Sequence, residues 1–264
     1  MDWGDVNLRR YSKHAKPVLV FALLVLFAAW ECEVSLADLA NGLRKGLMMI
    51  NLFFPPDWQA FARMVQPALA TVAVAALATP IGAVCAVVFG LAGASNIAPR
   101  WLRFTTRSLI ALERGIPEIV LLLILVAAFG MGAFAGVIAL VIGSIGMLGK
   151  LVADAIEEID ARTVDSVECV GATRAQVIRY AVLPQVFPSL VANTMFRFEV
   201  NIRASVLLGA VGAGGIGYEL TVAINQLEYR KATVAAIVSL ALVFLAERGS
   251  DILRSRMVAA ERLQ

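Results

Sequence analysis

The sequence predicts an all-α membrane protein that crosses the bilayer about six times. Of its 264 residues, 60% are hydrophobic and only 16% are charged, whereas soluble domains carry roughly a quarter charged residues. Several charge-poor stretches reach the roughly 20 apolar residues that a helix needs to cross a bilayer. They lack the alternation of barrel strands, and helices satisfy their own backbone hydrogen bonds in lipid, so helices are expected.

The N-terminal part, residues 1–63, is predicted to hold one membrane span and one surface segment. The span covers residues 17–30 and can begin as early as residue 11; because its apolar core is short, a cleaved signal peptide is the alternative. Residues 41–54 are amphipathic and are expected to lie along the bilayer surface. The run at residues 55–58 (PPDW) is expected to end that segment.

The other five spans are predicted within residues 64–250, which form the predicted transmembrane core, and residues 251–264 are a predicted cytoplasmic tail. Glycines at 130 and 132 are expected to make the short turn between the third and fourth spans. In the fourth span, further glycines recur at spacings that let membrane helices approach closely. The approximate limits are residues 64–93 for the second span, 108–149 for the third and fourth together, 186–208 for the fifth and 233–246 for the sixth.

The distribution of Lys and Arg predicts the orientation of these spans. The N-terminus, residues 94–107, residues 150–179 and the C-terminus hold 15 of the 23 Lys and Arg residues, and the opposite loops hold 5. Cytoplasmic loops carry the excess of positive charge in multi-pass proteins. We therefore expect both termini, and the loop after the fourth span, to lie in the cytoplasm.

Residues 163–184 form the longest polar stretch in the second half of the chain, and they predict two short helices that meet at a sharp corner. Thr163 is expected to cap the first helix, and Gly171 to follow its end in the left-handed conformation. Thr173 and Gln176 have the spacing of a capping box that starts the second helix. We call this segment the elbow.

The elbow resembles the cytoplasmic coupling loop of bacterial ABC importer permeases. That family's pattern is Glu-Ala-Ala, three residues, Gly, nine residues, Ile, one residue, Leu-Pro. Gly171 and Leu183-Pro184 match it, whereas residues 165–167 (DSV) replace the triplet and Ala181 replaces the Ile. The resemblance implies docking on an ATP-hydrolysing subunit; an ordinary connecting loop is the alternative. The implied coupling residues are Asp165, Glu168, Gly171, Ala172, Thr173, Leu183 and Pro184.

Ionisable and amide side chains inside the third and fifth spans are the candidate translocation pathway, because such groups usually face a bundle interior or a water-filled route. The i,i+4 spacing predicts that Arg114 pairs with Glu118 and Arg203 with Glu199, each along its own helix. Structural neutralisation at a packing interface is the alternative to a solute route. The set comprises Glu113, Arg114, Glu118, Asn193, Arg197, Glu199, Asn201 and Arg203.

The glycine-rich run after the fifth span is expected to form a compact turn or gate, built on Gly212, Gly214, Gly215 and Gly217. Its Gly-x-Gly-x-x-Gly spacing matches a dinucleotide fingerprint, but that motif needs a preceding strand in a soluble βαβ unit. The chain has no P-loop sequence. One histidine and three scattered cysteines predict neither a metal site nor catalytic groups.

Five stretches together resemble the permease subunit of phosphonate-type ABC importers, within the binding-protein-dependent type I family. They are residues 53–57 (FFPPD), 113–118 (ERGIPE), 143–150 (GSIGMLGK), 198–203 (FEVNIR) and 208–217 (LGAVGAGGIG). The resemblance implies the type I importer permease fold in a bacterial inner membrane. It also implies a homodimer, two cytoplasmic ATPase subunits that hold ATP and Mg²⁺, and a periplasmic or lipid-anchored binding protein.

In that reading this chain binds no cofactor and no nucleic acid, and its solute is a phosphonate or a related phosphorus anion. The alternatives are a methionine-type or other small-solute importer permease, and a stand-alone secondary transporter or channel. The second is disfavoured because no inverted internal repeat is evident. An intramembrane enzyme that uses Glu113 or Glu199 as an acid or base has no nucleophile or metal partner to support it.

Overall fold

The computed structural model describes residues 3–33 and 35–261, and the regular elements of these residues are all helices. The predicted all-α class is confirmed. The chain divides into two compact units, Met1–Phe54 and Pro55–Gln264. We call them the N-terminal and C-terminal units and describe each by itself.

The N-terminal unit contains α1 (Trp3–Glu31) and α2 (Leu36–Phe53). Ser35 caps α2 by accepting a hydrogen bond from the backbone N–H of Ala37 at 3.2 Å. The helix ends before Phe54, which is extended because it precedes a proline. The large apolar side chains of α2 from Leu39 to Leu52 are exposed, as are those of α1 within Pro17–Glu31, and this surface suits lipid rather than water.

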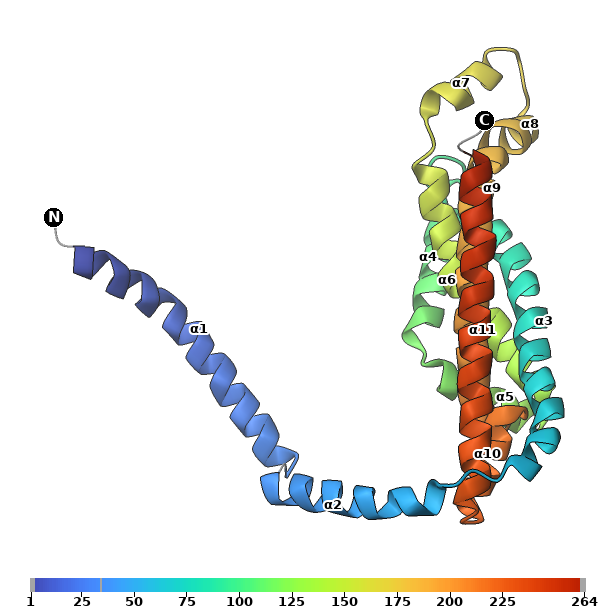
Figure 1. Cartoon of the computed structure of the whole chain (residues 1–264). Coiled ribbons are helices and arrows are strands. Elements are labelled where there is room, and N and C mark those ends of the chain that lie inside the picture. Colours follow the sequence, from blue (N-terminus) through green and yellow to red (C-terminus); the bar gives the residue numbers. More distant parts are fainter. Residues whose placement is uncertain (1–2, 34, 262–264) are drawn as a thin grey trace. The chain divides into compact units, whose positions relative to one another are not determined.

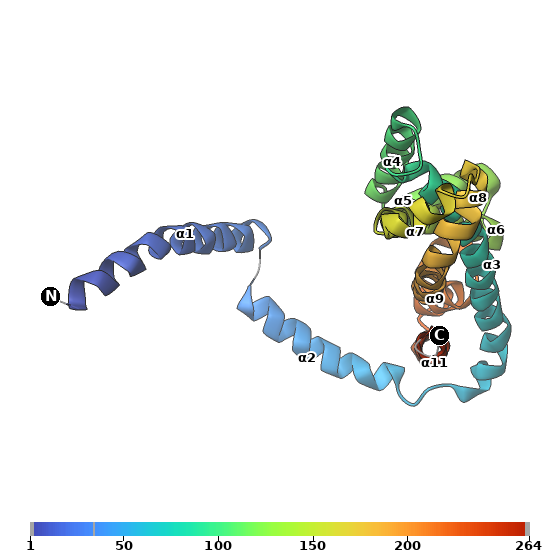
Figure 2. The same ribbon diagram turned by 90° about the horizontal axis from the view of Figure 1, so that it is seen from above.

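The C-terminal unit is a bundle of long helices with the elbow at one end (Figure 1). α7 and α8 lie at that end, and α5 and α10 lie at the opposite end; seen from above, α4 and α11 occupy opposite edges (Figure 2). In order, the elements are η1 (Trp58–Ala60), α3 (Phe61–Gly93), α4 (Arg100–Gly115), α5 (Glu118–Phe129), α6 (Ala133–Glu157), α7 (Ala161–Glu168), α8 (Arg174–Val177), η2 (Ile178–Val182), α9 (Leu183–Leu208), η3 (Gly209–Ala213), α10 (Ile216–Asn225) and α11 (Tyr229–Glu261).

Each of the six predicted spans falls on an apolar helix. Among the described residues, three helices are long and apolar enough to cross a membrane by themselves, and they contain the second, fourth and sixth predicted spans. The fifth predicted span lies in Arg174–Ala213, which makes a bent pair with Ile216–Asn225 at an angle of 53°. The first predicted span coincides with the shorter apolar helix Pro17–Glu31, and the third includes the shorter apolar helix Glu118–Phe129. The fold is therefore that of a polytopic membrane protein.

The third predicted span is not one continuous helix. α4 ends at Gly115 and α5 begins at Glu118, and Ile116 between them is extended, with φ of −94° and ψ of 122°. Pro117 explains the break, because the residue before a proline is pushed out of the helical region. The predicted turn at Gly130 and Gly132 is confirmed, since both glycines have positive φ, +87° and +148°.

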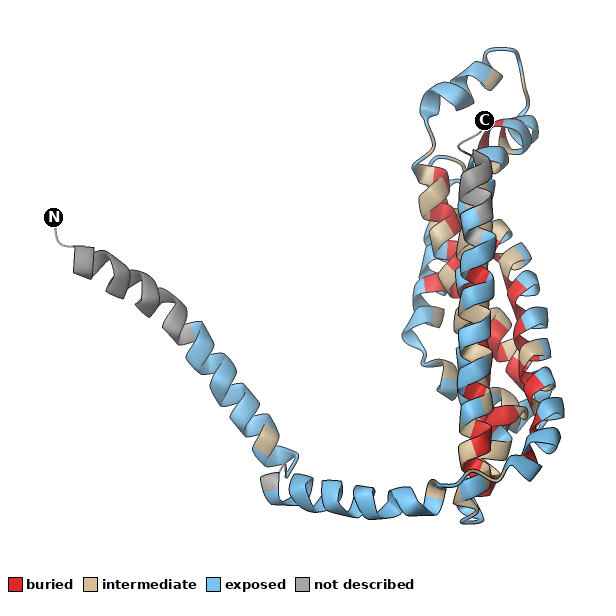
Figure 3. Ribbon diagram, viewed as in Figure 1, coloured by how far each residue is buried: buried red, intermediate tan, exposed pale blue. Residues whose placement is uncertain are grey.

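The close packing of α3 against α6 forms the centre of the C-terminal unit. Buried residues line the facing sides of the two helices (Figure 3). Small residues permit this approach, as predicted for the fourth span. α3 contributes in the same way: a Cβ at Gly82 would lie 3.3 Å from the carbonyl oxygen of Val141, and one at Gly90 would lie 2.7 Å from the Cβ of Val152.

We expect Gly90→Leu to destabilise the C-terminal unit, because the new side chain has no room against Val152. Overpacking of this kind costs about 1–3 kcal/mol. Thermal unfolding of the purified protein in detergent measures the effect. Gly249→Leu in α11 is the matched control, since a Cβ there would have nothing within 4 Å. Equal unfolding temperatures for the two variants would contradict the proposed packing.

Candidate functional site

The elbow is the first candidate site, and its first helix begins earlier than the sequence predicts. Asp160 is the N-cap of α7, because its carboxylate accepts hydrogen bonds from the guanidinium of Arg162 at 2.8 Å and from its backbone N–H at 3.0 Å. These hydrogen bonds lower the pKa of Asp160 below its ordinary value. The prediction that Thr163 caps this helix is wrong, because its N–H already bonds to the carbonyl oxygen of Asp160 at 3.1 Å.

The corner of the elbow has the predicted local structure. Gly171 has a φ of +82°, and its N–H bonds to the carbonyl oxygen of Glu168 at 2.9 Å. A Cβ there would have nothing within 4 Å, so the glycine is needed for its backbone conformation rather than for space. Thr173 and Gln176 form the predicted capping box, in which Gln176 Oε1 accepts the Thr173 N–H at 2.8 Å.

The second helix of the elbow is not short, which corrects the sequence prediction. α8 continues through the π-helical segment η2 into α9. Pro184 has no N–H to donate and its ring crowds the carbonyl four residues earlier, and a π-helical widening accommodates both effects. The N–H of Leu183 accordingly bonds to the carbonyl oxygen of Ile178, five residues back. The second half of the elbow is therefore continuous with the fifth span.

The elbow presents both an apolar and a charged surface. α7 has no buried residue, and Val170 at the corner is 83% exposed. A cavity of about 390 Å³ opens between α7, α8 and the loop after α3, with Asp165, Glu168 and Arg174 in its wall. The other predicted coupling residues lie at the corner or in the first turn of α9 and do not line this cavity. The elbow therefore offers an exposed corner beside a cavity whose wall carries charged side chains.

A buried polar cluster in the bundle interior is the second candidate site. Arg197 of α9 is 4% exposed; its Nη2 donates to Glu118 Oε1 of α5 at 2.8 Å and its Nε donates to Ser144 Oγ of α6 at 3.0 Å. One turn further along α9, Asn201 Nδ2 donates to Ser144 Oγ at 3.1 Å and to Thr79 Oγ1 of α3 at 2.9 Å. Four helices thus contribute side chains to one hydrogen-bonded network. We call these residues the Arg197 cluster.

Glycines of α6 provide the space for the charged members of the cluster. A Cβ at Gly143 would lie 2.8 Å from both Arg197 Nη2 and Glu118 Oε1. A Cβ at Gly146, one turn further, would overlap the carboxylate of Glu113. The side chains of α4, α5 and α9 therefore reach the α6 backbone only because these positions are glycine. Predicted residues Glu113, Glu118, Arg197 and Asn201 all lie on or beside this glycine face.

The predicted pairing of Arg114 with Glu118 is wrong. The i,i+4 rule assumes one continuous helix, and the break before Pro117 removes that geometry. Glu118 instead pairs with Arg197, which is distant in sequence, and the Glu118 side chain keeps 35% exposure. Arg114 is exposed and lies outside the cluster.

The predicted pairing of Arg203 with Glu199 is confirmed, with a third partner that the sequence does not reveal. Arg203 Nη2 lies 3.2 Å from Glu199 Oε1 and 2.8 Å from Glu247 Oε1 of α11. This group lies apart from the Arg197 cluster on α9, and the Arg203 side chain is 57% exposed. Asn193 does not join either group; its Nδ2 donates to Ser189 Oγ at 3.2 Å.

Three members of the Arg197 cluster were missed by sequence reasoning. Ser144 and Thr79 are hydroxyl residues in apolar helices, and Met147 contributes a sulfur 3.7 Å from Arg197 Nη1. Hydroxyls in membrane helices often bond to their own backbone, as Ser144 does with the carbonyl of Leu140. A Ser or Thr in an apolar stretch of sequence therefore does not by itself indicate a functional site. The position of Ser144 inside the run at residues 143–149 was the one available clue.

The glycine-rich run forms the predicted compact turn between η3 and α10. Gly212, Gly214 and Gly215 have positive φ, +116°, +80° and +77°. A Cβ at Gly217 would overlap the carbonyl of Val206, so the turn folds closely back on α9. Thr71 Oγ1 of α3 accepts the N–H of Ile216 at 2.9 Å and fixes the turn to the bundle. Whether it works as a gate stays a prediction.

A helical membrane bundle with interior charges and an exposed elbow is typical of a transport permease. The family described as "Binding-protein-dependent transport system inner membrane component" matches residues 86–259. The chain belongs to this family, and it is therefore a multi-pass inner membrane transport subunit.

Individual relatives agree with that family. The chain is 39% identical, over 89% of its length and 86% of the relative's, to the phosphite transport system permease protein PtxC of Stutzerimonas stutzeri. It is 42% identical to the phosphate-import permease protein PhnE of Mycolicibacterium smegmatis, over 77% of this chain and 39% of that protein. A solved subunit of the MetNI methionine ABC transporter, inward facing, has a TM-score of 0.63 and 25% identity, over 74% of this chain and 95% of that one. The predicted resemblance and the permease fold are confirmed.

We expect Glu118 and Arg197 to be energetically coupled. Arg197→Gln leaves the Glu118 carboxylate without its partner. In that background, the further change Glu118→Gln should lower the free energy of unfolding by less than it does in the wild-type protein. Coupling energies of contacting residues are about 0.5–3 kcal/mol. Unfolding of the four proteins in detergent gives the double-mutant cycle.

The exposed pair Lys150–Asp154, at 2.8 Å on α6, provides the control cycle. Exposed pairs of this kind contribute about 0.2–1 kcal/mol. If the Glu118–Arg197 cycle gave no more coupling than the control, the buried pair would have no special role in stability.

Proposed function

We propose that this chain is the permease subunit of an ATP-driven importer that carries a small phosphorus oxyanion, such as a phosphonate, phosphite or phosphate, into the cytoplasm. The observation that carries the proposal is the 39% identity to a phosphite permease over most of both chains. A methionine-type importer is the second candidate, because the methionine transporter subunit shares the fold; its 25% identity is the weaker support.

Within this proposal, Arg197 is the principal solute contact in the bundle interior. A guanidinium donates several N–H groups in a planar fork that fits phosphorus oxyanions. In the structure, Glu118 occupies one side of that fork through Nη2. An oxyanion that enters here would compete with Glu118 for Arg197. Glu113, Arg114, Asn193, Glu199, Asn201 and Arg203 complete the proposed pathway, and mutual neutralisation of Glu118 and Arg197 is the alternative role.

The elbow is the proposed contact with the ATPase. The residues that carry it are Asp165, Glu168, Gly171, Ala172, Thr173, Leu183 and Pro184. The ATPase subunits would bind ATP and Mg²⁺ and hydrolyse ATP, and this chain would bind no cofactor itself. The complete importer would contain a second copy of this chain, a cytoplasmic ATPase dimer and a periplasmic or lipid-anchored binding protein, within membrane lipid.

We also propose that both termini and the elbow face the cytoplasm, since most Lys and Arg residues lie on that side. A reporter that is active only in the periplasm should be active when fused after Asp57 and inactive when fused at the C-terminus. The reverse pattern would place the elbow outside the cell and remove it from contact with an ATPase.

Reconstitution tests the transport proposal directly. Proteoliposomes that contain this chain, its ATPase and a candidate binding protein should take up radiolabelled phosphonate or phosphite, and not methionine, in an ATP-dependent manner. Arg197→Lys should lower that uptake by roughly tenfold, because Lys cannot present a planar fork. Arg248→Lys on α11 is the control, because Arg248 is exposed and lies outside the proposed pathway, and it should retain uptake. Uptake of methionine alone would favour the second candidate.

Gly171→Val should uncouple the ATPase from transport. A β-branched residue with φ near +82° is strained by about 1–3 kcal/mol, so the corner must change shape. Gly171→Asn is the matched control, because Asn tolerates the left-handed conformation. We expect the Val variant to insert in the membrane but to lose solute-stimulated ATP hydrolysis. Normal uptake by the Val variant would show that the elbow is only a connector.

A further inference from the structure

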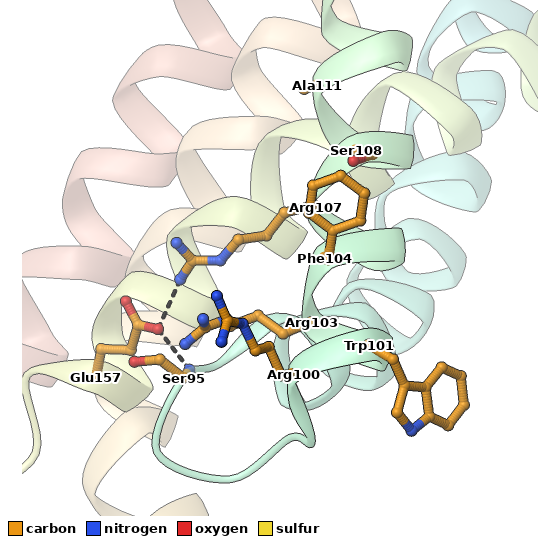
Figure 4. Close-up of a pocket in the computed structure, with 9 residues that line it drawn as sticks. All are labelled: Ser95, Arg100, Trp101, Arg103, Phe104, Arg107, Ser108, Ala111 and Glu157. Atoms are coloured by element: carbon orange, nitrogen blue, oxygen red, sulfur yellow. Dashed lines mark hydrogen bonds and ion pairs between the residues drawn. The ribbon is translucent and has the colours of Figure 1, made fainter.

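A basic pocket lies where α4 begins, and none of its lining residues belongs to the Arg197 cluster. Its volume is about 1080 Å³. The first turns of α4 form one wall, and Ser95 of the preceding loop and Glu157 at the end of α6 form the other (Figure 4). We call it the α4 pocket.

Positive charge dominates the α4 pocket. Arg100, Arg103 and Arg107 are spaced along one face of α4, and their guanidinium groups point towards Ser95 and Glu157 (Figure 4). Glu157 is the one acidic residue among those that line the pocket. Three arginines against one carboxylate leave the pocket with a net positive charge.

The hydrogen bonds in the α4 pocket divide the arginines into two kinds. Arg107 is structural: its Nε donates to the carbonyl oxygen of Gly93 at 2.9 Å, and its Nη2 donates to Glu157 Oε1 at 2.6 Å. The same carboxylate oxygen accepts the N–H of Ser95 at 2.5 Å. Within the described part of the chain, Arg100 and Arg103 take part in none of the ion pairs, so their donors are available to an anion.

Two aromatic side chains flank the α4 pocket on the outside of the bundle. Trp101 is 71% exposed and Phe104 is 75% exposed. The Trp101 ring points away from the guanidinium groups (Figure 4). Trp is enriched at the boundary between headgroups and acyl chains, and Phe is among the apolar residues that enter the acyl side of that boundary. A soluble anion would make no apolar contact with these rings, whereas a lipid has both a charged headgroup for the arginines and an apolar chain for the rings.

We propose that the α4 pocket binds the phosphate of an anionic phospholipid headgroup. Arg100 and Arg103 donate to the phosphate oxygens, and Trp101 and Phe104 contact the upper part of the acyl chains. Basic pockets between membrane helices bind anionic lipid headgroups. The site is independent of the transported solute and would anchor the start of α4 at the bilayer surface.

Quenching of Trp101 fluorescence tests this proposal. The full-length chain with Trp3→Phe, Trp30→Phe and Trp58→Phe retains Trp101 alone. It is reconstituted in phosphatidylcholine bilayers that contain either brominated phosphatidylglycerol or brominated phosphatidylcholine at the same mole fraction. We expect about fivefold enrichment of the anionic lipid beside Trp101. Arg100→Gln with Arg103→Gln should abolish the enrichment, and Arg114→Gln at the other end of α4 should leave it unchanged.

The comparison of the two brominated lipids can refute the proposal before any arginine variant is made. Equal quenching by both lipids would overturn the proposal. Enrichment that survives the double Gln change would also overturn it, because the arginines would then not hold the headgroup. Inorganic phosphate is added last, with chloride at the same ionic strength as control. Loss of enrichment with phosphate but not with chloride would support the proposal, because it would show that the headgroup phosphate is the group that the arginines bind.

Discussion

The ion pair between Arg197 and Glu118 is the interaction on which the interior of the bundle depends. A charge buried among membrane helices is costly unless it is paired and hydrogen-bonded. Arg197 meets that requirement through Glu118 Oε1 at 2.8 Å and Ser144 Oγ at 3.0 Å. These partners belong to α5 and α6, and Asn201 extends the network to Thr79 of α3. The relative positions of four helices are thus tied to the solvation of one guanidinium.

The same face of α6 serves packing and electrostatics together. Gly143 and Gly146 leave room for carboxylates from α5 and α4, and Ser144 between them lies against Gly82 of α3. Larger residues at these positions would separate the helices and remove the partners of the buried charges at once. Small residues in membrane helices usually bring backbones together; here they also admit ionisable side chains to the α6 backbone.

Most of the fold follows from local signals in the sequence, which is why it could be predicted. Length and hydropathy place the helices, and Gly171 and the capping box at Thr173 place the elbow corner. The site was predicted less well, since its partners come from distant segments. Asp160 replaces Thr163 as the cap because its carboxylate can accept hydrogen bonds from both the backbone and the side chain of Arg162. The partner of Glu118 was missed because Pro117 breaks the helix on which the spacing rule relies.

One helix links the features that the proposed importer needs. α8, η2 and α9 form a continuous rod from the elbow to the glycine turn, and Arg197 and Asn201 lie along it. The partners of these two residues lie on α3, α5 and α6, which are different helices. Any shift of α9 relative to α6 therefore changes the hydrogen bonds available to Arg197. In the proposed importer, movement of the elbow on the ATPase would weaken the ion pair between Glu118 and Arg197. The guanidinium of Arg197 could then bind an oxyanion. In that proposal, the continuity of this rod would connect ATP hydrolysis on the partner subunit with solute binding at Arg197.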